Sequence, residues 1–278
     1  MSVQFSTIGT MTALAGRIAA AAFYRLFDLI SLSAFGKQQM LHYPFFQKNG
    51  QTLLEGQKNF TDVCLAKLGS ITGKRLIEVG CGNGVQAIYI YDTYKPSKLV
   101  GVDLNPRLIR CATEATASLL RSGLKFAVDD AQTLSTLSDG TFDLLLCTES
   151  AHHYPDKEAF LSQVSRVLAR GSHFVIADLV RRDDAKFYRF EPSFSYNHWK
   201  IDHYREALPR HGLRLEIEEE LTKPLLAGLS DREAWFDDSG RTNLWRRIAE
   251  YVASLYARII IYELNCRFRY ILIAGVKA

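Results

Sequence analysis

The chain has 278 residues, of which 47% are apolar and 23% are charged, the ordinary balance of a globular protein. Its net charge of +4 is too small to indicate nucleic acid as a partner. Its five cysteines are scattered without C-x-x-C spacing, which indicates reduced thiols, and we expect a cytoplasmic location.

The N-terminal segment, residues 8–35, is poor in charge. Arg17, Arg25 and Asp28 interrupt it, so it lacks the roughly 18 consecutive apolar residues of a membrane-spanning helix. Apolar residues at four-residue spacing predict an amphipathic helix instead. We expect residues 1–60 to form a helical cap or lid. This cap packs on the domain or on a second copy in a homodimer, or it contacts a lipid or membrane surface. The next expected elements are an aromatic loop at 42–46 and a helix over 53–68.

The stretch 75–94 predicts a short buried strand, a glycine-rich loop and a helix, the βα unit typical of nucleotide-binding sites. Gly80, Gly82 and Gly84 let the loop backbone reach positive φ and approach a ligand closely. Their spacing puts the third glycine one residue too early for the pyrophosphate fingerprint G-x-G-x-x-G. Glu78 before the loop would also repel a pyrophosphate, and its carboxylate suits a cationic α-amino group.

Acidic residues end the next two predicted strands. Asp103 ends a strand over 98–103, about 20 residues after the middle glycine, the offset at which an acid binds ribose hydroxyls. Asp130 follows a strand that begins at residue 124, after a helix over 105–120. Helix caps and turns are the alternative roles for both acids. The pairing of Asp103 with the glycine loop favours ligand binding.

A histidine-containing loop at 149–156 follows the fourth predicted strand, 142–148. Because open α/β sheets bind ligands beyond the carboxyl ends of their strands, we expect this loop to border the reacting group. The remaining expected elements are a helix over 157–169, a fifth strand over 173–179, aromatic loops and helices over 180–211 that cap the site, a sixth strand over 213–219, a helical insert over about 230–264 and a seventh strand over 268–275.

Three strings resemble known motifs. E-V-G-C-G-N-G at 78–84 resembles motif I of the class I S-adenosylmethionine methyltransferases. E-S-A-H-H-Y-P-D at 149–156 is similar to the small-molecule group acting on glycosides, macrolides, tocopherols and other isoprenoid or polyketide products. C-R-F-R-Y-I-L at 266–272 resembles enzymes that methylate long-chain lipid diols. The resemblance covers about 74–180.

The resemblance implies a fold and a cofactor. It implies a doubly wound α/β fold of the Rossmann-like type, with a seven-stranded, mostly parallel sheet and an antiparallel last strand. We expect residues 61–278 to form this methyltransferase domain, with N-terminal helices before it and the helical insert before its last strand. The implied cofactor is S-adenosylmethionine.

The same resemblance assigns roles to residues in the loops. It implies that Glu78 binds the amino group of the methionine moiety, that Asp103 binds the ribose and that Asp130 accepts from the adenine amine. The whole set expected to contact the cofactor is Glu78, Gly80, Cys81, Gly82, Asp103, Leu104, Asp130, Ala131 and Glu149.

Transfer of a methyl group to a hydroxyl also requires removal of a proton. Histidine, with an unperturbed pKa of about 6.5, is suited to take it at neutral pH. In the glycoside-methylating enzymes the first histidine of such a pair is the proposed base. This implies His152 as the base, His153 as an auxiliary and Asp178 as the group that orients an imidazole or binds the acceptor. Loop packing of the histidines, and a turn cap or Mg²⁺ site at Asp178, are the alternatives; we expect no metal.

We therefore expect methyl transfer to a hydroxyl of a small, largely apolar or aromatic metabolite of secondary metabolism. Aromatic residues are dense over 43–46 and 187–204, which would roof the pocket. A carbon of an isoprenoid or polyketide, or a nitrogen, is the alternative acceptor. Base-amine methyltransferases of this fold carry a D/N-P-P-Y/F string where this chain reads Glu-Ser-Ala-His, so we expect no nucleic-acid substrate. A non-catalytic S-adenosylmethionine-binding subunit is the remaining alternative.

Overall fold

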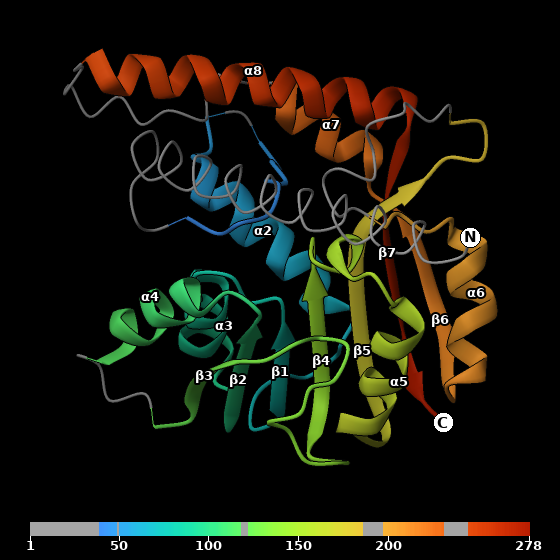
Figure 1. Cartoon of the computed structure of the whole chain (residues 1–278). Helices are drawn as coiled ribbons and strands as arrows, with labels where there is room; N and C mark the ends of the chain where they lie inside the picture. Colours follow the sequence, from blue (N-terminus) through green and yellow to red (C-terminus); the bar gives the residue numbers. More distant parts are fainter. Residues whose placement is uncertain (1–38, 49, 118–121, 186–196, 231–243) are drawn as a thin grey trace, which may run out of the picture.

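The computed structural model describes residues 39–48, 50–117, 122–185, 197–230 and 244–278. The described strands form a seven-stranded sheet in the order β3-β2-β1-β4-β5-β7-β6 (Figure 1). β1 to β5 run parallel, whereas β7 is antiparallel to both of its neighbours, β5 and β6. The predicted seven-stranded, mostly parallel sheet is therefore confirmed. The strands are β1 (Arg75–Val79), β2 (Lys98–Asp103), β3 (Leu124–Val128), β4 (Phe142–Thr148), β5 (Leu168–Arg181), β6 (Leu213–Glu220) and β7 (Phe268–Lys277).

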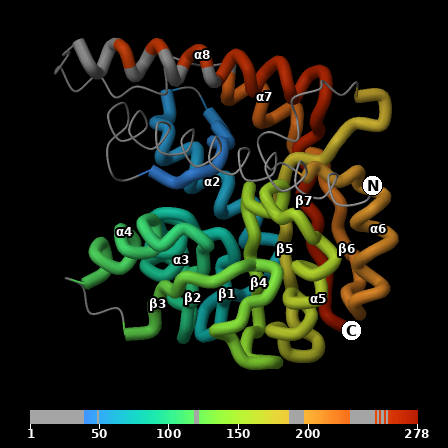
Figure 2. The backbone as a smooth tube through the Cα atoms, viewed as in Figure 1, coloured from blue at the N-terminus to red at the C-terminus, as the bar shows by residue number. Residues whose placement is uncertain are grey.

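Helices pack on both faces of this sheet, as Figure 2 also shows. Phe160 of α5 and Leu208 of α6 belong to the hydrophobic core on one face. Phe60 of α2, Ile90 of α3 and Leu264 of α8 belong to the core on the other. The doubly wound arrangement follows from these two cores. The described helices are α2 (Leu53–Ala66), α3 (Val85–Tyr94), α4 (Pro106–Ala117), the 3₁₀ helix η1 (Ala151–His153), α5 (Lys157–Val167), α6 (Ile201–Arg210), α7 (Thr222–Ser230) and α8 (Leu244–Cys266).

The position of each strand in the sheet follows from its sequence. β4 is an apolar run buried on both faces, as a central parallel strand requires. β6 alternates apolar and charged residues and lies at the sheet edge, where one face meets water. The period-two pattern therefore predicted a strand correctly and also identified a half-exposed one.

The largest differences from the predicted boundaries lie at the start of β5 and around the predicted helical insert. α5 ends at Val167, and β5 begins at Leu168, five residues earlier than expected. The pairing with β4 shifts register between Phe142 and Leu144, so the break expected at 170–172 is a bulge inside a longer strand. The helical insert expected over about 230–264 corresponds to α8, which ends two residues later, at Cys266. The helix α7, which precedes it, was not predicted, and residues 231–243 lie outside the described residues.

The predicted N-terminal helix over 8–35 lies outside the described residues. The boundary expected at residue 60 falls inside α2, which packs into the same core as β5, so residues 53–60 belong with the sheet. Thr52 caps α2 and Glu55 completes a capping box, which fixes where this helix begins. Gln57 on α2 bonds the backbone of Met40 and His42 and so holds residues 39–46 against the domain.

The carboxyl ends of the parallel strands define one edge of the molecule, and the strand order reverses between β1 and β4 at that edge. Ligands of open α/β sheets bind at such a reversal. α8 runs across the molecule beyond the same edge (Figures 1 and 2). The loops after β1, β2, β3, β4 and β5 therefore meet where a ligand is expected.

Candidate active site

The glycine loop after β1 is fixed to the neighbouring strand. Gly80 has a φ of 76°, and a Cβ on it would lie 1.9 Å from the Ser150 side-chain oxygen. The N–H groups of Gly80 and Cys81 both donate to the Val102 carbonyl, at 2.8 and 3.0 Å. Only glycine fits this position, and the loop turns directly into the N-terminus of α3.

Glu78 provides the strongest observation in favour of a cationic ligand. Its side chain is 1% exposed, and its Oε2 atom is buried without a hydrogen-bond partner in the described structure. Burial, with a smaller contribution from the charge of Asp103, raises the pKa of Glu78 to about 8. A buried carboxyl group with an open acceptor fits the α-amino group of S-adenosylmethionine, which would supply both the hydrogen bond and the opposite charge.

Asp103 lies opposite the glycine loop at the end of β2. Its Oδ2 accepts from the Gly82 N–H at 2.9 Å and its Oδ1 accepts from the Asn105 N–H at 2.8 Å. Burial raises the pKa of Asp103, although both hydrogen bonds oppose that change. Each carboxylate oxygen has a second lone pair, so the group can still accept from two ribose hydroxyls.

We expect Asp103→Ala to weaken S-adenosylmethionine binding by roughly 10- to 150-fold, the equivalent of about 1.5–3 kcal/mol for hydrogen bonds to a charged group. Isothermal titration calorimetry measures this change. Asp103→Asn keeps one acceptor oxygen and should lose less affinity. Unchanged affinity in the alanine variant would remove Asp103 from the site.

The end of β3 separates the roles of two adjacent acids. Asp129 accepts from the backbone and hydroxyl of both Ser135 and Thr136. Burial alone would raise the pKa of Asp129, but these hydrogen bonds outweigh it and lower the pKa, so this carboxylate stabilises the loop. The Asp130 carboxylate accepts from Gln132, two residues on. Asp130 is thus the acid less engaged in loop structure, in line with its predicted contact to adenine.

Exposed apolar side chains mark the same corner of the site. Leu104, which follows the buried strand β2, is 63% exposed, and Val128, which ends β3, is 45% exposed. Val128 pairs in register with Asp103, so these side chains lie beside the expected ribose position. An apolar surface there suits the faces of a planar base. The sequence analysis included Leu104 and missed Val128, whereas Ala131 is buried in the core.

Two predicted cofactor residues have other contacts in the structure. The Cys81 side chain is buried and faces β2, where its sulfur would meet a Cβ on Gly101 at 2.9 Å. Glu149 has a φ of 48°, and its Oε1 accepts from the Tyr43 N–H at 2.7 Å and the Tyr270 hydroxyl at 3.1 Å. Burial raises the pKa of Glu149 to about 8 despite these bonds. Glu149 therefore joins residues 39–46 to the sheet.

Residues 39–46 pack against the glycine loop. The Asn83 side chain donates to the Gln39 carbonyl at 2.7 Å, and a Cβ on Gly82 would lie 2.7 Å from the Leu41 side chain. Leu41 is 43% exposed. This segment thus belongs to the cofactor side of the site, and it is one described part of the predicted N-terminal cap over residues 1–60.

His152 and Asp178 form a buried pair at the ends of β4 and β5. The His152 Nδ1–H donates to Asp178 Oδ1 at 2.5 Å, and the His152 backbone N–H donates to Oδ2 at 2.6 Å. Burial would raise the pKa of Asp178, but the charge and hydrogen bond of His152 outweigh it and lower the pKa, so the carboxylate stays ionised. In the neutral form of the imidazole, the carboxylate keeps the ring proton on Nδ1, which leaves the lone pair on Nε2.

The structure adds two residues that the sequence analysis missed. The His198 ring stacks parallel to His152 with centroids 5.3 Å apart, and it lies 4.1 Å from the Phe268 ring. Lys157 is 1% exposed, its ammonium donates to the Asn197 carbonyl, and burial lowers the pKa of Lys157 to about 8. His198 falls within the aromatic stretch 187–204, which was the available signal; residues 187–196 of that stretch lie outside the described structure.

His153 lies next to the His152–Asp178 pair. Its ring centroid lies 3.9 Å from that of His152. Burial, together with the charges of His152, His198 and Lys157, lowers the pKa of His153 well below its usual value. His153 therefore stays uncharged near neutral pH, which suits an auxiliary role beside a base.

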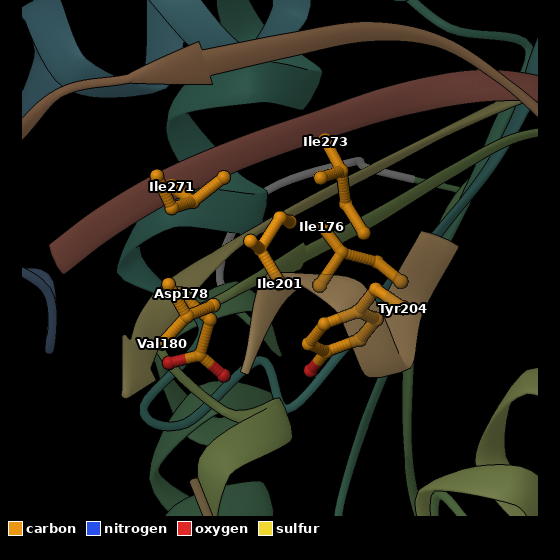
Figure 3. A pocket seen from close by; sticks show the side chains of 7 residues that line it. All are labelled: Ile176, Asp178, Val180, Ile201, Tyr204, Ile271 and Ile273. Atoms are coloured by element: carbon orange, nitrogen blue, oxygen red, sulfur yellow. The ribbon is translucent and has the colours of Figure 1, made fainter. Parts of the chain in front are cut away.

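A small cavity lies behind Asp178, between β5, β7 and α6 (Figure 3). Its volume of about 10 Å³ corresponds to about one water molecule. This cavity is too small for an acceptor. Its aliphatic walls shield Asp178 and so strengthen its interaction with His152. The lining residues are Ile176, Asp178, Val180, Ile201, Tyr204, Ile271 and Ile273.

Metal and membrane features were also sought in the described part of the chain. There, no three or more His, Cys, Asp or Glu side chains gather as a metal ion requires. The described helices include none with the length and apolar character needed to cross a bilayer.

Comparison with known proteins decides the family. A family model described as a methyltransferase domain matches residues 71–231, more than half of the chain and the part that holds the glycine loop, Asp103, His152 and Asp178. The chain belongs to this methyltransferase family. The methyltransferase uses S-adenosylmethionine as its cofactor.

Two relatives illustrate the range of the match. A fatty-acid O-methyltransferase of Mycolicibacterium smegmatis is 39% identical over 120 residues, which are 43% of this chain and 42% of that protein. A phthiotriol/phenolphthiotriol dimycocerosates methyltransferase of Mycobacterium leprae is 32% identical over 154 residues, 55% of this chain and 51% of that protein. The methyltransferase thus matches about half or less of the length of these relatives.

A solved structure shows the fold. Geranyl diphosphate C-methyltransferase from Streptomyces coelicolor A3(2), in complex with Mg²⁺, geranyl diphosphate and S-adenosylhomocysteine, superposes with a TM-score of 0.67. The superposition covers 87% of this chain and 90% of that one at 17% identity. At this identity the likeness shows the Rossmann-like methyltransferase fold alone.

Proposed function

We propose that the methyltransferase transfers a methyl group to a hydroxyl of a small, largely apolar, lipid-like acceptor, with His152 as the base. The 2.5 Å hydrogen bond between His152 Nδ1 and Asp178 Oδ1 carries this proposal. A buried carboxylate that holds an imidazole in one tautomer is the arrangement that makes histidine an effective general base. The fit of Glu78, Asp103 and the exposed Leu104 and Val128 to the parts of S-adenosylmethionine supports the placement of the donor.

Each residue has a separate task in this proposal. S-adenosylmethionine, when bound, supplies a methyl group on a sulfonium. The glycine loop and Glu78 hold the donor, so the acceptor has to be positioned by residues of the other loops. His152 Nε2 takes the hydroxyl proton while Asp178 keeps Nδ1 protonated and stabilises the imidazolium that forms. The ring of His198 orients His152 by stacking on it.

The apolar acceptor is inferred from the relatives and from the surroundings of the pair. The names of the two relatives specify a fatty acid and phthiotriol or phenolphthiotriol dimycocerosates as acceptors, all of them lipids. Phe268 and Trp199 lie beside His198 and Lys157 and are consistent with an apolar wall near the base.

The proposal is tested with the purified full-length protein and a panel of acceptors. The panel contains a long-chain alcohol, a lipid diol, a phenol, a fatty acid and a short charged amine, each with labelled S-adenosylmethionine. We expect methyl ethers from the alcohols or the phenol, identified by the carbon-13 shift of the new methyl group. A product with the methyl group on carbon would favour the C-methyltransferase alternative. Methylation of the amine alone would contradict the proposal.

A further inference from the structure

Large apolar side chains are exposed at two places in the described structure. Eight such side chains are at least 43% exposed. Three of them, Leu41, Leu104 and Val128, belong to the cofactor site, where a bound ligand would cover them. The other five all lie on α8: Ile248 at 45%, Tyr251 at 72%, Leu255 at 48%, Ile259 at 50% and Tyr262 at 53%.

The five side chains form one stripe, which we call the α8 outer face. Their spacing of three, four, four and three residues follows the helical repeat, so they lie along one side of α8. Ala257 and Leu264 on the opposite side are 1% and 0% exposed and pack into the core. The inner face of α8 therefore packs on the domain, whereas the outer face stays exposed, and an exposed apolar stripe of this kind indicates an interaction surface.

The chemistry of the α8 outer face fits a lipid–water interface. Tyr251 and Tyr262 combine an apolar ring with a hydroxyl, the character that places tyrosine at membrane surfaces. Arg258, exposed beside Ile259, adds a positive charge. The acid Glu263 is neutralised by an ion pair with Arg267 at 3.0 Å. An apolar stripe with tyrosines and an arginine suits an anionic lipid surface.

The location of α8 gives such docking a consequence for catalysis. α8 lies beyond the edge where the parallel strands end, and it runs across the molecule at a large angle to them (Figure 1). One residue after α8, β7 begins with Phe268, which contacts His198 beside the His152–Asp178 pair. A lipid surface against α8 would therefore meet the same edge of the molecule as the active site.

A second copy of the chain is a poorer fit to this face. From Ile248 to Tyr262 the helix rises roughly 21 Å and is about 10 Å wide, so its footprint is roughly 200 Å². A stable protein–protein interface buries about 800 Å² on each partner. A single-helix stripe falls well below that area, whereas a lipid surface needs no matching partner.

We propose that the α8 outer face docks the methyltransferase on an anionic lipid surface and so brings its active-site edge to membrane-resident acceptors. The use of such acceptors rests on the proposed function. The docking itself is measured without donor or acceptor, so the two proposals can fail separately.

The test is co-sedimentation of the full-length protein with vesicles of phosphatidylglycerol and phosphatidylcholine, and with vesicles of phosphatidylcholine alone. The variant Tyr251→Ser, Leu255→Ser, Ile259→Ser should lose roughly 100-fold in partition to mixed vesicles, because three apolar side chains no longer enter the interface. The matched control Tyr251→Phe, Leu255→Met, Ile259→Leu keeps the apolar face and should bind like the wild type. Arg258→Ala should lose about fivefold, and only on anionic vesicles.

Calorimetric S-adenosylmethionine binding should be unchanged in all three variants, which also shows that they are folded. The proposal is overturned if the wild type binds neither kind of vesicle, or if the serine variant binds as well as the wild type. It is also overturned if light scattering shows a wild-type dimer that the serine variant dissociates, because a second copy then covers this face. Should the serine variant fail to fold, the loss expected for Arg258→Ala still decides the question.

Discussion

His152→Ala should lower kcat with a hydroxyl acceptor by about 10²–10⁴-fold, while affinity for S-adenosylmethionine changes by no more than a few-fold. The hydroxyl proton must leave as the new C–O bond forms, and His152 is the imidazole that a buried carboxylate orients at the end of β4. Single-turnover kinetics with saturating donor and acceptor measure this loss, because they separate the chemical step from product release.

Asp178→Asn is the companion variant to this test. An asparagine side chain can donate to Nδ1, which would place the imidazole proton on Nε2, where the base needs a lone pair. A loss of kcat of the same order, without a matching loss of donor affinity, would identify Asp178 as the residue that sets the tautomer. His153→Ala should cost less, because burial and its charged neighbours hold His153 uncharged beside the base.

Retention of near-normal kcat by His152→Ala would mean that the enzyme works by alignment alone, and the assignment of the base would be lost. The choice of acceptor decides how this result is read. A carboxylic acid is already ionised near neutral pH and needs no base, so the variant has to be assayed on a verified hydroxyl acceptor. A fatty-acid substrate serves as the control, because its methylation should survive the substitution.

The sequence predicted those parts of the site that depend on local chain geometry. Gly80 and Glu78 lie in one contiguous βα unit, and a few residues determine its conformation. Asp103 could be predicted because parallel neighbouring strands end at the same edge, so a strand-end acid has to lie near the loop. β2 and β4 have the predicted bounds, and β1 and α3 fill the predicted stretch 75–94, because each is a short run with an unambiguous pattern and clear ends.

The parts that were missed depend on contacts between segments far apart in the chain. Glu149 lies next to the strand end, as predicted, but Tyr43 and Tyr270 take up its carboxylate from segments more than 100 residues away. Local sequence contains no information about those two partners. His198 is likewise 46 residues away from His152, and the hydrogen bond from the Arg181 N–H to the Trp199 carbonyl holds its segment beside the end of β5. Cys81 is buried against β2, where its sulfur would lie 2.9 Å from a Cβ on Gly101, a residue 20 positions further along the chain.

The sequence also did not predict which side of helix α8 is buried. The sequence predicted a long helical insert, but a period of 3.6 residues cannot tell which side of a helix packs on its own domain. In α8 apolar residues occur on both sides, and only the structure shows that Ala257 and Leu264 face inward while Tyr251 and Tyr262 face outward. The sequence of α8 therefore predicted that a helix forms, but not which of its side chains are exposed.

The second large effect is expected at Glu78. Glu78→Gln should weaken S-adenosylmethionine binding by roughly 10- to 150-fold, because an amide cannot supply the charge that opposes the ammonium group.

The wild type should also show a pH dependence of S-adenosylmethionine binding that the variant lacks. With a pKa of about 8, Glu78 is protonated at neutral pH in the cofactor-free protein and must release a proton to pair with an ammonium group. The affinity of the wild-type protein for S-adenosylmethionine should therefore rise by up to about tenfold per pH unit between about pH 6 and 8.

Above about pH 8 the amino group of the ligand loses its own proton, so wild-type affinity should fall again. The glutamine variant should show no rise below pH 8. Glu149→Gln is the matched control: burial also raises the pKa of Glu149 to about 8, but its carboxylate accepts from the Tyr43 N–H and the Tyr270 hydroxyl. That variant should keep the rise. Calorimetry in buffers of different ionisation enthalpy counts the released proton directly.

The sign of the stability change provides an independent check on Glu78. Its pKa is raised on folding from 4.5 to about 8, so the folded protein binds more protons than the unfolded chain between these values, and stability falls as pH rises through this window. Glu78→Gln removes that loss. The cofactor-free variant should therefore unfold at a higher temperature than the wild type at about pH 8–9 and show little difference near pH 4. A variant that binds the donor normally, or that is destabilised at high pH, would show that Glu78 does not hold the amino group as an open, buried acceptor.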